Sequence, residues 1–159
     1  MTLLAAFISL LVAQAAPAWS VALDPSAAHA SNVHWTFSLS AGYCGGWQIG
    51  NGVFIQPETP LSFADPVPSD AVLFAGQAAD VSIQNGVLQV APAAGLAHSQ
   101  ICTQGDRQFT VELLPSLGLT NPDAGTYVVD VWTGTNPSMQ QLPVTVDDPP
   151  TSDTSDQTE

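Results

Sequence analysis

Apolar and polar residues alternate with a period of two in most of the chain after residue 30. Residues 33–40, VHWTFSLS, place four apolar side chains on one face of an extended strand and four polar ones on the other. Residues 80–90, DVSIQNGVLQV, form two such arms around Asn85-Gly86, a dipeptide typical of a type I′ hairpin turn. Shorter runs of the same kind lie at residues 49–55, 109–113, 127–132 and 142–146. The pattern predicts a series of half-buried strands.

About seven short strands separated by turn residues predict an all-β domain, either a sandwich or a barrel. No window of ten or more residues after residue 30 carries apolar side chains at helical spacing. Residues 57–69 contain four prolines and are therefore expected to form a loop or an edge instead of a central strand. With 159 residues, 45% of them hydrophobic, the chain is long enough for one such domain and its core.

The first 23 residues carry no charge, and the first ionised side chain is Asp24. An uncharged apolar run of this length is typical of a signal peptide or of a membrane-spanning helix. Pro17 and the alanine-rich stretch after it favour a removed signal peptide, although the usual basic residues before the run are missing. Small-residue cleavage sites end at Ala15, Ala22 and Ala30. We predict an apolar export helix within residues 1–30, with membrane contact only through residues 1–23 if they are retained.

Residues 147–159, DDPPTSDTSDQTE, contain five acidic residues and no apolar side chain. Such a segment has nothing to bury, so ordering it would cost conformational entropy without a compensating gain. We predict a disordered acidic tail there and place the folded domain at residues 31–146. The alternative is that some of these acids close a calcium site with Asp123 or Asp130.

The charge balance excludes several classes of partner. The chain has 14 acidic residues, no lysine and one arginine, Arg107, which gives a formal net charge of −13. Binding to nucleic acid requires several basic side chains against the phosphates, and so does attachment to an anionic lipid surface. We therefore expect neither as a partner. Lysine–asparagine crosslinks, found in some surface proteins, are impossible without lysine.

Cys44 and Cys102 are the two cysteines of the chain. In an oxidising compartment two cysteines usually pair, so export predicts a disulfide between them. Closing a loop of this length would stabilise the fold by roughly 4 kcal/mol on the chain-entropy model. The alternative is a pair of free, buried thiols.

Residues 108–134, QFTVELLPSLGLTNPDAGTYVVDVWTG, resemble a segment of secreted bacterial immunoglobulin-like modules. The shared features are an alternating strand, a loop with Asn-Pro, and Gly-Thr-Tyr leading into a final alternating strand. Residues 52–90 are similar to the middle part of those modules, including a short strand at DAVLFAG, and the likeness extends loosely over residues 33–146. It implies an immunoglobulin-like antiparallel β-sandwich of about seven strands.

The same resemblance implies a tyrosine corner, in which a tyrosine near the start of a late strand bonds to backbone upstream. Tyr127 would be that tyrosine, with Asp123 and Gly125 shaping the turn. The cysteines depart from the antibody pattern, because Trp47 lies three residues after Cys44 where an antibody domain keeps its tryptophan about a dozen away. The chain is therefore similar to the broad bacterial type of module and not to an antibody domain.

No residue pattern indicates catalysis. The chain lacks a GxSxG nucleophile motif, and its acidic residues lie in predicted loops, where solvated surface is a better interpretation than a glycosidase pair. The three histidines and Met139 are not spaced as copper or zinc ligands, and no loop has the acid spacing of a calcium loop. We expect no catalytic residue, no metal and no cofactor.

Trp47 lies among glycines, where a tryptophan either packs against the core and disulfide or stacks on a sugar ring. Taken together, these observations predict a secreted or cell-surface protein that is a non-enzymatic structural or adhesive module of the bacterial cell envelope. Its expected partners are other envelope proteins or surface glycans. The alternative function is a module that binds carbohydrate or another ligand, with Trp47 as the contact.

Overall fold

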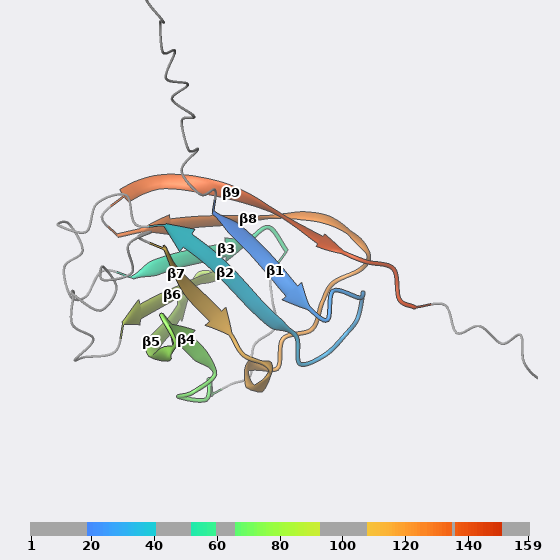
Figure 1. Ribbon diagram of the computed structural model, residues 1–159, viewed down its shortest axis with the longest axis horizontal. Coiled ribbons are helices and arrows are strands. Elements are labelled where there is room, and N and C mark those ends of the chain that lie inside the picture. The colour runs from blue at the N-terminus through green and yellow to red at the C-terminus, as the bar shows by residue number, and fades with distance from the viewer. Residues whose placement is uncertain (1–18, 41–51, 60–65, 93–107, 135, 151–159) are drawn as a thin grey trace, which may run out of the picture.

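The computed structural model (Figure 1) describes residues 19–40, 52–59, 66–92, 108–134 and 136–150. Within these ranges the fold consists of nine strands and one 3₁₀ turn. The strands are β1 (Ser20–Asp24), β2 (His34–Ser40), β3 (Val53–Pro57), β4 (Val72–Phe74), β5 (Gln77–Gln84), β6 (Val87–Pro92), β7 (Gln108–Leu113), β8 (Gly125–Thr133) and β9 (Asn136–Val146). The turn, η2 (Pro115–Leu117), follows β7. In the described part of the chain, no helix has the length and apolar character needed to cross a bilayer.

All nine strands belong to one antiparallel sheet, in the order β1-β2-β7-β4-β5-β6-β3-β8-β9. The sheet curls until its first and last strands, β1 and β9, lie side by side, so it is nearly closed into a barrel (Figure 1). The predicted all-β class is confirmed. The described chain has nine strands, whereas the alternation of apolar and polar residues predicted about seven. The alternation pattern did not identify β1, and β4 was suggested only by the resemblance to immunoglobulin-like modules.

The core is built by the alternation that the sequence shows. On β2 the side chains of Trp35, Phe37 and Leu39 are buried, while those between them face outward, as the pattern predicted. Every other strand except β1 and β5 also contributes buried apolar side chains to the same cluster, and β1 and β5 pack against it with partly buried ones. The interior of the barrel is therefore filled by side chains.

The hairpin predicted from residues 80–90 is present as β5 and β6. Val81 pairs with Val90 and Ile83 with Leu88, so the apolar arms lie opposite one another. Both turn residues have positive φ, 53° at Asn85 and 79° at Gly86, as a type I′ turn requires. The predicted hairpin is confirmed.

The start of the domain differs from the prediction, which assigned residues 1–30 to an export segment. Strand β1 pairs along its whole length with β2, and Val21 and Leu23 pack against the core. Trp19 donates from its indole N–H to the main-chain oxygen of Ser40 and to its hydroxyl, at 3.1 Å each. Residues 19–30 thus belong to the fold, and their alternation was hidden by the uncharged run that precedes them. Residues 1–18 lie outside the described ranges.

The end of the domain lies close to the predicted boundary. Strand β9 ends at Val146, and Asp147 still makes backbone hydrogen bonds, donating to Ser26 at 2.9 Å and accepting from Ala28 at 2.8 Å. The predicted tail of residues 147–159 therefore begins with a residue that belongs to the fold. Its remainder from residue 151 is outside the described part of the chain.

Candidate functional site

Three of the predicted site residues, Cys44, Trp47 and Cys102, lie outside the described residues. The strand ends that lead to the two cysteines are described, however. Ser40, the last residue of β2, is the register partner of Gln108, the first residue of β7. The connection that contains Cys44 and the connection that contains Cys102 therefore leave the barrel from adjacent points.

The predicted corner residues Asp123, Gly125 and Tyr127 are brought together where the chain enters β8. The Tyr127 hydroxyl donates to the main-chain oxygen of Asp123 at 2.8 Å, four residues upstream. The Asp123 carboxylate lies 3.2 Å from Nε2 of His29, and both side chains are largely exposed. Gly125 is the first residue of β8. This arrangement fixes the loop that leads into β8.

Asn121 is the buried anchor beside this corner, with 2% of its surface exposed. Its amide Nδ2 donates to the main-chain oxygens of Pro25 and Ala27, at 2.9 Å each, and its backbone N–H donates to Ala30 at 2.9 Å. Sequence reasoning treated Asn121 only as a turn former, because its partners lie in the segment that was predicted to be removed. We call residues 25–30 and 119–127 together the Asn121 corner.

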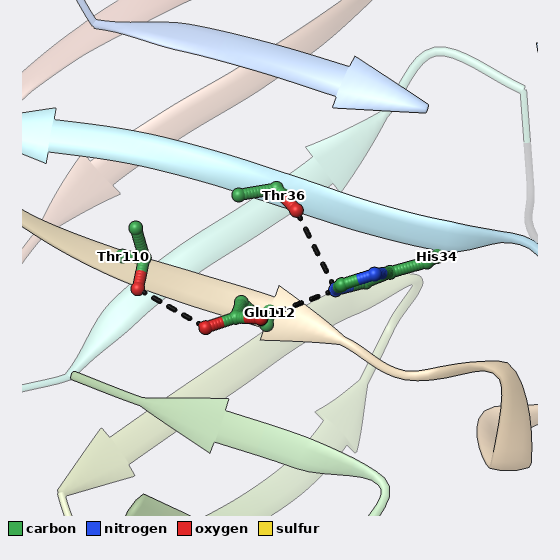
Figure 2. A network of polar contacts seen from close by, with 4 residues as sticks. All are labelled: His34, Thr36, Thr110 and Glu112. Atoms are coloured by element: carbon green, nitrogen blue, oxygen red, sulfur yellow. Dashed lines mark hydrogen bonds and ion pairs between the residues drawn. The ribbon is translucent and has the colours of Figure 1, made fainter. Parts of the chain in front are cut away.

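A polar network covers the outer face of β2 and β7 (Figure 2). Glu112 accepts from Nε2 of His34 at 3.2 Å and from the Thr110 hydroxyl at 3.2 Å, and Thr36 lies 3.4 Å from the same His34 nitrogen. The His34 and Glu112 side chains are 30% and 24% exposed. Every member has a partner within the network, which indicates a structural role. Across the described ranges no three His, Cys, Asp or Glu residues gather as metal ligands.

The outer face of β3, β8 and β9 carries a hollow of about 300 Å³ that sequence reasoning did not predict. Strand register builds it, because Gln56 pairs with Asp130 and Asp130 pairs with Gln141 across the three strands. Side chains two residues apart on a strand share a face, so Glu58 and Val128 join this row. The residues that line the hollow, which we call the outer groove, are Gln56, Pro57, Glu58, Val128, Asp130 and Gln141.

The outer groove contains two carboxylates and no positive charge. Glu58 accepts from the Val128 backbone N–H at 3.4 Å. Oδ1 of Asp130 is buried and has no hydrogen-bond partner among the described residues. Oδ1 of Asn121 and Nε1 of Trp35 are also buried without a partner, but Asp130 is the charged member of the three, and a carboxylate is the most unfavourable of these groups to bury without a donor.

An aromatic pair lies beside the outer groove on the same face. Phe54 precedes Gln56 by two residues, Trp132 follows Asp130 by two, and the two rings are register partners. They stack with centroids 5.4 Å apart and planes at 7°. The pairing of β8 with β9 is irregular between Val131 and Thr133, next to Trp132, and both rings are partly exposed. Irregularities of this kind re-aim a side chain relative to the regular sheet.

One feature of the sequence points to this outer face. The predicted strand at residues 127–132 places Asp130 and Trp132 on the side opposite its buried residues. The groove itself could not be predicted, because Gln56 and Gln141 come from strands far apart in sequence. Only the strand order places β3 and β9 on either side of β8.

Comparison with known proteins yields a likeness of fold. No protein family matches the chain, and no curated protein matches it either. Among solved structures, the fold is similar to that of BslA, described as a bacterial hydrophobin, with a TM-score of 0.53 and 16% sequence identity. The match covers 82% of this chain and 98% of the BslA chain. At this identity the likeness supports the all-β fold of the chain and goes no further.

Proposed function

We propose that the chain is an exported, non-enzymatic structural or adhesive module of the bacterial cell envelope, which acts through its outer surface without a cofactor. The observation that carries the proposal is the filled interior: the barrel strands direct apolar side chains into one continuous core. A barrel packed in this way holds no internal ligand, so its interactions take place on the outside. The acidic, lysine-free composition favours solubility outside the cell and excludes nucleic acid as a partner.

Export is part of the proposal, and the fold restricts where a signal peptide is removed. Cleavage after Ala22 would cut through β1, and cleavage after Ala30 would remove β1 and the carbonyl groups that Asn121 binds. Cleavage after Ala15 leaves Trp19 and all of β1 in place. We therefore propose that the mature protein is secreted or displayed on the cell surface and begins at Ala16.

The Cys44–Cys102 disulfide also belongs to the proposal. Cys44 follows the end of β2 by four residues and Cys102 precedes the start of β7 by six, while Ser40 and Gln108 at those strand ends are paired. These short spacings from paired strand ends are compatible with the Cα separation of about 4.4–6.8 Å that a disulfide needs. The bridge would tie together two connections at one end of the barrel.

The kinship with secreted bacterial immunoglobulin-like modules is proposed on the sequence resemblance and on the hydrogen bond from Tyr127 to Asp123. In this proposal the nearly closed nine-strand sheet is a variant of the seven-strand sandwich, with β1 covering the gap beside β9. Carbohydrate binding through Trp47 is the alternative function.

Cell fractionation tests the proposal. A tagged copy expressed in a bacterium should appear in the medium or the envelope fraction, and deletion of the gene in its own host should change surface attachment or envelope integrity. Restoring the wild-type gene should reverse the change. Retention of the uncleaved chain in the cytoplasm would contradict the proposal.

A further inference from the structure

We propose that the outer groove binds a neutral saccharide, whose hydroxyl groups donate to Glu58 and Asp130 while its ring packs on Trp132. This inference rests on the proposed surface role, since a glycan ligand is met outside the cell. It names the ligand of a particular face and places the contact at a site other than Trp47.

The charge of the side chains that line the outer groove limits the class of ligand that it can bind. The groove presents the carboxylates of Glu58 and Asp130 together with the amides of Gln56 and Gln141, and no basic side chain lines it. An anion would be repelled by both carboxylates and by the net charge of −13. A ligand rich in neutral hydroxyl groups suits this lining, because hydroxyls donate to carboxylates and both donate to and accept from amides.

The unpaired oxygen of Asp130 favours a ligand that donates hydrogen bonds. Its Oδ1 is buried without a donor from the described residues, although Gln56 and Gln141, its neighbours across the strands, both carry amide donors. Both glutamine side chains are exposed, and the proposal requires the ligand to displace them in order to reach this oxygen. A ligand hydroxyl that reaches this carboxylate would therefore supply a hydrogen bond that the chain does not make itself, and charge-assisted bonds of this type are strong.

The aromatic pair separates a saccharide from a metal ion. A cation would use the carboxylates and amide oxygens alone and would gain nothing from Phe54 and Trp132 on the next row of the face. A sugar has apolar C–H faces as well as hydroxyls, and an amphipathic aromatic surface next to polar acceptors matches both. A linear saccharide that runs along β8 would meet Asp130 and Trp132 in succession.

The volume also fits a small ligand. About 300 Å³ is the lower end of the range of pockets that hold small molecules, about 300–1,000 Å³. The hollow lies on an open sheet face, where the end or a short stretch of a longer glycan can be seated while the remainder stays in solvent.

Titration of the purified chain with neutral oligosaccharides of glucose, mannose, galactose and N-acetylglucosamine tests the inference, followed by calorimetry and tryptophan fluorescence. We expect saturable binding to at least one of them. Trp132→Ala and Gln141→Ala should each weaken it about tenfold or more, which corresponds to the loss of one good contact. Gln140→Ala is the matched control, because Gln140 is also exposed but points to the opposite side of β9, and its affinity should equal that of the parent chain.

Four results would overturn the inference, provided that thermal melts show folded variants. They are no saturable binding to any member of the panel, equal weakening by Gln140→Ala and Gln141→Ala, loss in Trp47→Ala with Trp132→Ala unaffected, and saturable calcium binding lost in Asp130→Asn with no sugar binding. The third result would keep a carbohydrate ligand but move it to Trp47. None of these four results bears on the proposal that the protein is exported, which cell fractionation tests separately.

Discussion

The Asn121 corner and the outer groove each contain a partly unpaired polar side chain, but the two side chains differ in charge and in the bonds that they make. In the corner, the buried amide of Asn121 donates both of its hydrogens to backbone oxygens, although its neutral Oδ1 has no hydrogen-bond partner among the described residues. In the groove, Asp130 keeps a buried carboxylate oxygen for which the described residues supply no donor. The two residues differ in charge and in the bonds that they donate: Asn121 ties two segments of the fold together through its two amide hydrogens, whereas Asp130 is a carboxylate that our proposal assigns to a ligand.

Removal of residues 1–30 should have the largest effect on this comparison, because it deletes one side of the Asn121 corner. A chain that begins at Ser31 loses β1, the packing of Val21 and Leu23, and the carbonyl groups that Asn121 binds. We expect a loss of about 4 kcal/mol or more in the free energy of unfolding, measured by urea denaturation. A chain that begins at Ala16 is the control and should retain full stability. Equal stability of the two would contradict the assignment of β1 to the fold.

Asn121→Ala should have the next largest effect. The substitution leaves the oxygens of Pro25 and Ala27 without their donor and opens space at a site that is 2% exposed. We expect destabilisation of about 2–3 kcal/mol by the same measurement. Gln141→Ala, in the outer groove, should stay within about 0.5 kcal/mol of the parent chain, as exposed substitutions usually do. If the two substitutions lowered the free energy of unfolding by similar amounts, the contrast between the corner and the groove would be contradicted.

Asp130→Asn should leave stability unchanged or raise it by up to about 1 kcal/mol. The amide is close in shape to the carboxylate and costs less to bury without a partner. The same variant should lose affinity for the saccharide, so binding is lost without a loss of stability. A clear loss of stability would mean that the carboxylate makes a stabilising contact in the folded chain, against the assignment of Asp130 to ligand binding.

Glu112→Gln should have the smallest effect of the series. The His34–Glu112 pair lies on the outer face of β2 and β7, where a partly exposed polar contact of this kind contributes about 0.2–1 kcal/mol. Glutamine keeps an oxygen that still accepts from the Thr110 hydroxyl. We expect a change in the thermal midpoint of only a few degrees and no change in saccharide affinity. A large shift in either would give this network a role beyond local structure.

The sequence predicts the strands well where burial is one-sided. The alternation at residues 33–40 and the Asn85-Gly86 turn are local signals, and the structure has β2 and the β5–β6 hairpin at those positions. Strand β1 was missed because its five residues follow an uncharged run that reads as a signal peptide. Val21 and Leu23 do show the alternation of a strand, but the uncharged apolar run of the predicted signal peptide overlaps these residues and obscures it.

The candidate site was beyond sequence reasoning for a different reason. Asp130 and Trp132 are visible as the outward residues of one strand, yet the groove needs Gln56 and Gln141 from strands about 75 and 11 residues away. Which strands lie beside β8 depends on long-range pairing and not on any local pattern. Neither the strand order nor the unpaired oxygen of Asp130 is encoded in a motif.

The intact mass of the protein recovered from the culture medium, measured before and after reduction, tests the central claim most directly. The claim is that an exported surface module folds around a β1 that survives signal-peptide removal. It predicts a mature chain that begins at Ala16 and is about 2 Da lighter before reduction, as a Cys44–Cys102 disulfide requires. A mature chain that begins at Leu23 or Ser31, or a chain found only inside the cell with residues 1–15 attached, would contradict it.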